Sequence, residues 1–234
     1  MAGENQGDGD HAGRMDRIYR RQRYIYDLTR KYFLFGRDRL VRQLGAVPGE
    51  RIVEIGCGTA RNLIRIARTH PGIRLYGLDA SAEMLRTAEA AIARAKLPEP
   101  IVLKQGLAEN LTPAVFDLPR PFDHAIFSYS LSMIPDWRAA LIAACHSVRP
   151  DGFVHVVDFG DFKKIWAPAG RSFRSYLGLW HVTPRTELLR ALESQGGSAE
   201  PCALHLLPGH YAFVVKAVPG AILSRLQMST AISR

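Results

Sequence analysis

The stretch Arg51-Ile52-Val53-Glu54-Ile55-Gly56-Cys57-Gly58-Thr59-Ala60-Arg61-Asn62 decides the fold of this chain. A short apolar run rich in β-branched residues is followed by two glycines at alternate positions, and then by a helix-like run from Asn62 to Thr69. That order predicts a strand, a tight turn and the start of a helix. Glycine lets the backbone turn sharply and lets a ligand approach it closely. The first turn of the helix then offers N–H groups and a positive dipole end to that ligand.

The spacing of the small residues narrows the class of ligand. A dinucleotide fingerprint needs Gly or Ala at position 61, where this chain has Arg61. The pattern is instead Glu-x-Gly-x-Gly-x-Ala, running from Glu54 to Ala60. It resembles motif I of the class I S-adenosylmethionine-dependent methyltransferases, in which the last small residue is often Gly. A tight turn that binds no ligand is the alternative interpretation.

A second acidic residue stands where an adenosine ligand would need it. Ile73 to Asp79 is predicted to be the next strand, and Asp79 lies 21 residues beyond Gly58. Its carboxylate can accept hydrogen bonds from both ribose hydroxyls. Asp79 or Ser81 could instead cap the helix that begins near Ala82. Because the glycine turn lies upstream of Asp79 at the expected distance, we favour the ribose role for this residue.

Length and composition set broad limits on the protein. The chain has 234 residues, 47% of them hydrophobic, which fits one sizeable α/β domain or two small ones. Cys57, Cys145 and Cys202 are far apart, show no metal spacing and suit free thiols in a reducing compartment. The sequence shows neither a membrane-spanning run nor a signal peptide. We therefore expect a cytoplasmic protein, or one attached peripherally to the inner face of the cell membrane.

The positive charge is concentrated near the N-terminus. The net charge of the chain is +9, and the ten basic and three acidic residues between Arg14 and Arg42 account for +7 of it. Such concentration indicates an anionic partner, either nucleic acid or acidic lipid. Aromatic residues alternate with these bases, which is typical of an interfacial amphipathic helix. A helix packed on the domain with a solvated basic face is the alternative.

Strand-like and helix-like segments alternate over most of the chain. This pattern predicts a Rossmann-like α/β fold, a doubly wound parallel sheet with a C-terminal antiparallel strand. The resemblance to the methyltransferase family implies an N-terminal helical lid as well. The expected organisation is a disordered tail over 1–13, basic aromatic helices over 14–46, a methyltransferase domain over 47–218 with an inserted flap at 160–181, and a mobile tail over 219–234. The expected strands are 51–55, 73–79, 101–105, 122–128, 153–159 and 211–218, and the expected helices are 59–69, 82–96, 137–148 and 184–194.

Ligands of such sheets bind at the carboxyl ends of the strands. After the third strand the family often has Gly-Asp-Ala, whereas this chain has Gly106-Leu107-Ala108, so main-chain groups are expected to replace the acid that meets the adenine. The candidate cofactor residues in the sheet are Glu54, Gly56, Cys57, Gly58, Thr59, Asn62, Asp79, Ala80, Met84, Gly106, Leu107, Ala108 and Ser128.

The candidate catalytic residues follow the fourth strand. Methyl transfer is an in-line displacement that needs a neutral nucleophile, alignment and exclusion of water. For an amine acceptor, Ser128 or Tyr129 could hold the N–H, although Tyr129 could equally be a core residue. No cluster has metal spacing, so no metal is expected. Ser128-Tyr129-Ser130-Leu131 differs from the Asp/Asn-Pro-Pro-Tyr motif of methyltransferases that act on bases, and no RNA-binding module is visible.

The stretch from Met15 to Leu40 carries a more specific resemblance. With Tyr26-Asp27 and Gly36-Arg37, it is similar to bacterial phospholipid-type N-methyltransferases, most closely to those that trimethylate diacylglyceryl-homoserine to a betaine lipid. The resemblance implies S-adenosylmethionine as cofactor, a lipid substrate at an anionic membrane surface, and the enzyme that makes the homoserine lipid as a partner. It also implies that Tyr26, Tyr32 and Arg37 belong to a lid over the cofactor.

A homoserine head group offers a carboxylate for a guanidinium and an amine that becomes quaternary, which aromatic faces attract. The candidates for an aromatic cage around the amine are Tyr19, Tyr129 and Trp166, and Tyr19 is also a candidate catalytic residue. The candidates for binding the carboxylate are Arg20, Arg21 and Arg174. The alternatives are a phosphatidylethanolamine N-methyltransferase, an RNA or small-molecule methyltransferase, and a cofactor-binding regulator without turnover.

Overall fold

The structure, a computed structural model, describes residues 34–165, 167–179, 182–193 and 201–232. Residues 36 onward form one compact unit, and Met1–Phe35 belongs to a separate one. The predicted disordered tail, most of the N-terminal lid, and the candidates Tyr19, Arg20, Arg21, Tyr26, Tyr32 and Trp166 lie outside the described residues.

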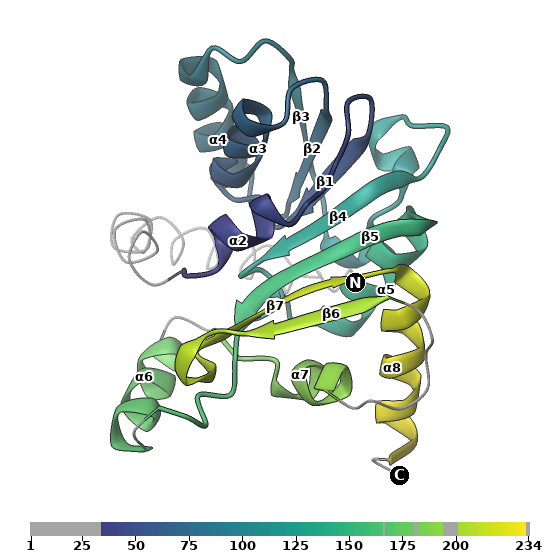
Figure 1. Cartoon of the computed structure of the whole chain (residues 1–234). Helices are drawn as coiled ribbons and strands as arrows, with labels where there is room; N and C mark the ends of the chain where they lie inside the picture. Colours follow the sequence, from purple (N-terminus) through teal and green to yellow (C-terminus); the bar gives the residue numbers. More distant parts are fainter. Residues whose placement is uncertain (1–33, 166, 180–181, 194–200, 233–234) are drawn as a thin grey trace, which may run out of the picture. The chain divides into compact units, whose positions relative to one another are not determined.

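One seven-stranded sheet organises the unit from Gly36 onward (Figure 1). Its spatial order is β3-β2-β1-β4-β5-β7-β6; the first five of these strands are parallel, and β7 runs antiparallel to both β5 and β6. The predicted doubly wound sheet with an antiparallel C-terminal strand is confirmed. The strands are β1 (Arg51–Ile55), β2 (Arg74–Asp79), β3 (Ile101–Gln105), β4 (Phe122–Ser128), β5 (Val148–Phe159), β6 (Cys202–Leu206) and β7 (Ala212–Ala217).

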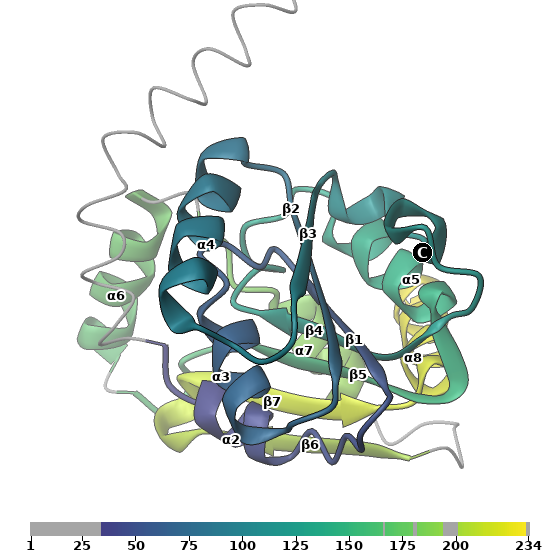
Figure 2. The same ribbon diagram turned by 90° about the horizontal axis from the view of Figure 1, so that it is seen from above.

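Helices cover both faces of the sheet (Figures 1 and 2). One face carries α2 (Arg37–Arg42), α3 (Arg61–Thr69) and α4 (Ala82–Ala95). The opposite face carries α5 (Trp137–Ser147), α7 (Thr186–Glu193) and α8 (Pro219–Ile232). Helix α6 (Ala167–Leu179) follows β5 at the carboxyl edge of the sheet. Three short 3₁₀ helices in the described residues lie in connections between the other elements: η1 (Ala108–Asn110), η2 (Pro113–Phe116) and η3 (Pro208–His210). In the described residues no helix combines the length and the apolar character required to cross a membrane.

The central strands are apolar on both faces because helices pack on each side. All five residues of β1 are buried, and in β4 every residue except Asp123 is buried. A continuous core joins β1, β4, β5 and β7 to the helices α5, α7 and α8. This rigid sheet fixes the positions of the loops at its carboxyl edge.

Three expectations about element boundaries are corrected. The mobile tail predicted from residue 219 is wrong over Pro219–Ile232, because this segment is a helix whose Ile222 and Leu226 are buried in the core. The strand expected at 153–159 begins earlier, at Val148, directly after α5. The edge strand β6 was not predicted, since its alternating half-buried pattern is short and contains a histidine.

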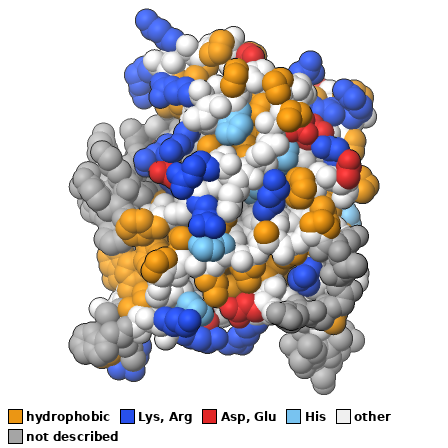
Figure 3. All heavy atoms as spheres, viewed as in Figure 1, with side chains coloured by type: hydrophobic (Ala, Val, Ile, Leu, Met, Phe, Trp, Pro, Cys, Tyr) orange, Lys and Arg blue, Asp and Glu red, His pale blue; other side chains and the backbone are white. Residues whose placement is uncertain are grey.

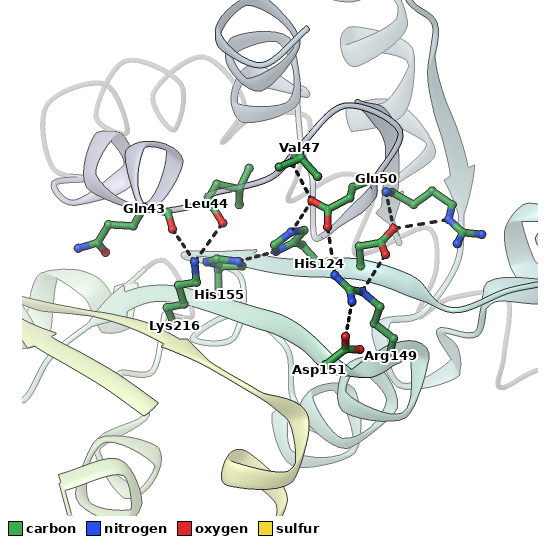
Figure 4. A network of polar contacts seen from close by, with 11 residues as sticks. Gln43, Leu44, Val47, Glu50, His124, Arg149, Asp151, His155 and Lys216 are labelled. Carbon is green, nitrogen blue, oxygen red and sulfur yellow. Dashed lines mark hydrogen bonds and ion pairs between the residues drawn. The ribbon is translucent and has the colours of Figure 1, made fainter. Parts of the chain in front are cut away.

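A polar network ties the loop before β1 to the amino end of β4, to His155 of β5 and to the carboxyl end of β7 (Figure 4). The Glu50 carboxylate contacts His124 Nε2 at 3.1 Å and accepts a hydrogen bond from Arg149 at 3.1 Å. His124 Nδ1 lies 3.0 Å from Nε2 of the buried His155. Lys216 Nζ donates to the main-chain oxygens of Gln43 and Leu44, at the end of α2. This network lies at the end of the sheet opposite the candidate site.

Candidate functional site

The loop after β1 approaches the loop after β4 so closely that only glycine fits. Gly56 has φ of 68°, and a Cβ atom there would lie 2.6 Å from the Cβ of Ser130. Ser130 Oγ donates to the main-chain oxygen of Ile55 at 2.8 Å. The N–H groups of Gly56 and Cys57 both donate to the oxygen of Leu78, at 2.8 and 3.1 Å. The predicted glycine turn therefore joins three adjacent strand ends.

The helix that follows begins without a side-chain cap. Ala60 stands before its first residue with φ of 58°, and Gly58 also has a positive φ, 54°. Glu54 is buried, and its Oε1 accepts a hydrogen bond from Nδ2 of Asn62 at 2.7 Å. This bond fixes the first turn of α3 to the end of β1, so the N-terminus of the helix faces the loop.

Asp79 bridges the first two loops of the site. Its Oδ2 accepts from the main-chain N–H of Gly58 at 2.8 Å, and its Oδ1 accepts from the N–H of Ser81 at 2.9 Å. The residue is partly exposed, and a carboxylate oxygen has lone pairs for more than one donor. The hydroxyl of Ser81 caps α4 by accepting from Met84 N–H at 3.3 Å, so the capping role belongs to Ser81.

The turn after β3 is held against the turn after β2. Gly106 N–H donates to the oxygen of Asp79 at 3.0 Å, and Gln105 Nε2 donates to the oxygen of Ala80 at 3.1 Å. Leu107, which follows, is 52% exposed, whereas Met84 and Ala108 are buried. The sequence-predicted residues after β2 and β3 thus come together in one partly apolar surface.

The end of β4 carries the two candidate catalytic residues. Ser128 is buried, and its Oγ has no hydrogen-bond partner among the described residues. Tyr129 has φ of 57°, which is uncommon for a residue with a Cβ atom. Burial raises the pKa of the Tyr129 phenol well above its ordinary value, and the neighbouring Tyr211 and Asp158 raise it further. The phenol is therefore neutral at physiological pH.

Tyr129 belongs to a cluster of six aromatic side chains, most of which the sequence did not single out as site residues. Its ring centroid lies 4.7 Å from that of Phe159, at the end of β5. Phe162 and Tyr211 lie 5.8 Å apart, and both contact the ring of Phe173 from α6. We call this set the aromatic wall: Tyr129, Phe159, Phe162, Phe173, Tyr176 and Tyr211. Phe162, Phe173 and Tyr176 lie in the segment 160–181 that was expected to form a flap, whereas Phe159 and Tyr211 fall within expected strands and carried no signal of a site.

Two guanidinium groups border the aromatic wall. The Cζ of Arg37, the first residue of α2, lies 5.8 Å from the centroid of the Tyr129 ring. The Cζ of Arg174 lies 5.7 Å from the centroid of Phe162. Cations at this distance over aromatic faces are attracted to them. Of the sequence-predicted arginines, these are the two that the described structure brings to this edge.

Asp161 holds the loop that carries Phe162. Its Oδ1 lies 3.2 Å from Nδ1 of His210, and its main-chain oxygen accepts from Arg174 at 2.6 Å. Lys163 Nζ forms an ion pair with its Oδ2 at 2.7 Å, and the hydrogen bonds from Lys163 and His210 lower the pKa of the Asp161 carboxyl despite its burial. Phe162 and His210 both have positive φ, 58° and 54°. Backbone strain of this kind gathers at functional sites, and Tyr129 shares it at the same sheet edge.

In the described residues no group of three His, Cys, Asp or Glu side chains is arranged to hold a metal ion. Cys57 is buried, and burial raises the pKa of its thiol, so it is a packing residue beneath the glycine turn. Thr59 lies at the mouth of that turn and is only half buried. The sequence-predicted residues of the strand ends therefore converge on one edge, whose chemistry is a carboxylate, an uncapped helix start, a buried hydroxyl and an aromatic wall.

Comparisons with known proteins agree with this geometry. A family model described as a methyltransferase domain matches residues 53–154. The demethylmenaquinone methyltransferase of Beutenbergia cavernae is 30% identical over 190 residues, covering 79% of this chain and 70% of that protein. The demethylmenaquinone methyltransferase of Tropheryma whipplei (strain Twist) is 27% identical over 177 residues, covering 72% and 69%. A solved structure of a SAM-dependent methyltransferase from Aquifex aeolicus matches in fold, with a TM-score of 0.55 and 18% identity over 80% of this chain and 92% of that one.

Proposed function

Because the chain belongs to the S-adenosylmethionine-dependent methyltransferases of class I, we propose that it methylates the amine of diacylglyceryl-homoserine three times to give the betaine lipid diacylglyceryl-trimethylhomoserine. The observation that carries this proposal is the aromatic wall with Arg37 and Arg174 beside it. The product is a quaternary ammonium, which aromatic faces attract, and the head group keeps a carboxylate, which a guanidinium binds. The resemblance of the stretch Met15–Leu40 to betaine-lipid methyltransferases supports the same substrate.

The residues at the sheet edge fit S-adenosylmethionine. The cofactor supplies an electrophilic methyl group on a positively charged sulfur. Asp79 presents a carboxylate at the end of β2, oriented by its bonds to Gly58 and Ser81, and a carboxylate suits two ribose hydroxyls. Gly56 lets the loop after β1 pack directly against Ser130, where a Cβ atom would collide, and so fixes the main chain of the glycine turn. The partly apolar surface at Ala80, Met84 and Leu107 suits an adenine ring.

The chain's contribution to the transfer is orientation of the acceptor. The amine nitrogen uses its lone pair to form the new N–C bond while the C–S bond breaks, and the positive charge passes from sulfur to nitrogen. The first and second rounds each release one proton, whereas the third leaves a permanent cation. Ser128 Oγ, which is buried and without a partner among the described residues, is suited to accept a hydrogen bond from the amine N–H in the first two rounds. The aromatic wall then holds the dimethylated amine in the third.

The proposal is tested by the lipid profile of a host that makes unmethylated diacylglyceryl-homoserine. Expression of the full chain should give mono-, di- and trimethylated homoserine lipids, measured by mass spectrometry. An Asp79→Ala variant, produced at the same level, should give none. If no homoserine lipid is methylated by well-folded protein, the proposal is wrong, and methylated phosphatidylethanolamine would identify the alternative lipid.

A second candidate is C-methylation of a reduced naphthoquinone. It is favoured by the relatives from Tropheryma whipplei and Beutenbergia cavernae, 27% and 30% identical, which are both named demethylmenaquinone methyltransferases. An aromatic wall also suits a flat ring, and His210, which contacts Asp161, is a side chain that could accept the ring hydroxyl proton. Purified protein incubated with a reduced demethylmenaquinone and S-adenosylmethionine decides between the two: methyl transfer to the ring and none to the homoserine lipid would favour this second candidate.

A further inference from the structure

Helix α6 has two faces of opposite character. Its inner face packs on the aromatic wall: the ring of Phe173 lies 5.5 Å from Phe162 and 5.4 Å from Tyr211, and Leu177 is buried. Its outer face is exposed and consists of Pro168, Arg171, Ser172, Ser175, Gly178 and Leu179. The helix is therefore an outer cover of the aromatic wall.

The outer face of α6 and the loop before it are positively charged. Lys163, Lys164, Arg171 and Arg174 are all exposed. The single acidic residue of the segment 160–179 is Asp161, which is 6% exposed and paired with Lys163. Within the described part of the chain, no ion pair involves Lys164, Arg171 or Arg174. In Figure 3, Lys and Arg side chains lie along the lower edge of the molecule, beside hydrophobic side chains at the lower left.

An exposed apolar side chain lies at the end of this charged surface. Leu179 is 74% exposed, more than any other exposed large hydrophobic residue in the described ranges. It is preceded by Gly178, where an added Cβ atom would meet nothing within 4 Å. In sequence, the aromatic residue Trp180 follows directly. A large apolar side chain held in water beside a basic face is the arrangement of helices that lie in a membrane interface.

We propose that the outer face of α6, with Lys163 and Lys164, docks the enzyme on an anionic lipid surface and so places the aromatic wall beside the membrane. We call this surface the α6 basic surface: Lys163, Lys164, Arg171 and Leu179. The charge complements acidic phospholipid head groups, and Leu179 enters the boundary between head groups and acyl chains. This inference rests on the proposed function in one respect, because a lipid acceptor requires the active site to lie beside a membrane.

Vesicle binding tests the charge of the α6 basic surface. The full chain is sedimented with phosphatidylcholine vesicles that contain phosphatidylglycerol and, separately, with phosphatidylcholine vesicles alone. The double variant Lys164→Glu/Arg171→Glu should bind the anionic vesicles about tenfold more weakly or worse, because each basic side chain near such a surface contributes roughly fivefold in affinity. The matched control Arg68→Glu/Arg94→Glu carries the same change of charge on exposed positions of α3 and α4, and should bind like wild type.

A dye at the end of α6 tests the position of docking. Leu179→Cys is labelled with an environment-sensitive dye in a Cys202→Ser background, because Cys57 and Cys145 are buried. Anionic vesicles should shift its emission to the blue, whereas a dye at Arg68→Cys should not respond. An unshifted dye at position 179 contradicts the inference, as does equal vesicle binding by wild type and the double variant. Loss of RNA binding by the double variant with vesicle binding intact would assign the surface to nucleic acid instead.

Activity separates this inference from the proposed function. With homoserine lipid in anionic vesicles, Lys164→Glu/Arg171→Glu should lose most of its activity, while with a short-chain, monomeric homoserine acceptor its kcat/KM should equal that of wild type. If no homoserine acceptor is methylated by any form, the proposed function fails, and the vesicle and dye measurements still decide the role of α6. Equal losses on the vesicular and the monomeric acceptor would contradict docking through this face.

Discussion

The carboxylate of Asp79 lies 2.8 Å from the main-chain nitrogen of Gly58 and accepts its hydrogen bond. This contact joins the end of β2 to the glycine turn after β1, and it orients the carboxylate before any ligand arrives. A ligand that uses both loops therefore finds them already positioned, which reduces the entropy lost on binding.

Asp79→Asn should weaken S-adenosylmethionine binding about 10- to 100-fold, because hydrogen bonds to a charged acceptor contribute about 1.5–3 kcal/mol. The amide oxygen of Asn can still accept from Gly58, so the fold should be retained. Isothermal titration calorimetry measures the change. Asp117→Asn is the control: this exposed acid pairs only loosely with Lys104, at 3.5 Å, and should bind the cofactor like wild type. Unchanged affinity in Asp79→Asn would remove the ribose role.

Gly56→Ala should destabilise the protein more than Gly49→Ala. Both glycines have positive φ, 68° and 92°, so either substitution costs about 1–2 kcal/mol of backbone strain. Only at Gly56 does the new methyl meet another residue, Ser130, and that crowding should lower the free energy of unfolding by a further 1–3 kcal/mol or so. Urea denaturation of both variants gives the comparison, and equal losses would show that the two loops separate easily.

Ser128→Ala should lower activity without lowering stability. The Oγ of Ser128 is buried without a partner among the described residues, so its removal should leave the free energy of unfolding unchanged or raise it by about 1 kcal/mol. The loss of one hydrogen bond to the acceptor should reduce kcat/KM roughly fivefold to tenfold. Ser147→Ala is the opposite case: its buried hydroxyl donates to the main-chain oxygen of Leu111 at 3.0 Å and is not a site residue, so stability should fall and kcat/KM should hold. Full activity in Ser128→Ala would exclude the orienting role.

Stability should decrease as the pH falls from 7 to 5. Burial lowers the pKa of both His124 and His155, and the charge of Lys216 lowers them further, while Glu50 opposes this for His124 (Figure 4). In the unfolded chain these histidines bind protons near pH 6.5, whereas in the folded chain both bind them less readily. The unfolded state therefore binds more protons below about pH 6.5, and the free energy of unfolding falls there by at most about 2.7 kcal/mol per pH unit for two histidines.

The carboxyl group of Asp158 has the opposite effect on stability as the pH falls. Burial raises the pKa of its carboxyl to about 6, so between pH 6 and 4 the folded state binds the additional proton and is stabilised as the pH falls. Asp158→Asn should therefore show a steeper loss of stability toward pH 5 than wild type. Urea denaturation at pH 5, 6 and 7 measures both slopes, and stability that rises on acidification in Asp158→Asn would contradict the histidine assignment.

The local order of residues was sufficient to predict the glycine turn, the acid after the second strand and the parallel sheet. Each of these depends on neighbours in the chain: the turn requires Gly56 and Gly58 directly after a buried strand, and Asp79 follows its own strand. The sequence could not decide whether Asp79 or Ser81 caps α4, because both residue types suit a helix cap. The structure assigns the cap to Ser81 and shows that Asp79 instead bonds to Gly58.

What the sequence by itself determined was the class of fold and the strand ends that form the site, since hydrophobic periodicity and glycine spacing are local properties. Only the tertiary structure decided which side chains form the aromatic wall, where we propose that the methyl acceptor binds. Tyr129, Phe159, Phe173 and Tyr211 come from four separate segments, and nothing in their spacing indicates that their rings meet. The same holds for α8, whose burial of Ile222 and Leu226 depends on the core that α5 and α7 provide. Contacts between distant segments form only when the sheet brings them together, so they cannot be found from any one stretch of the chain.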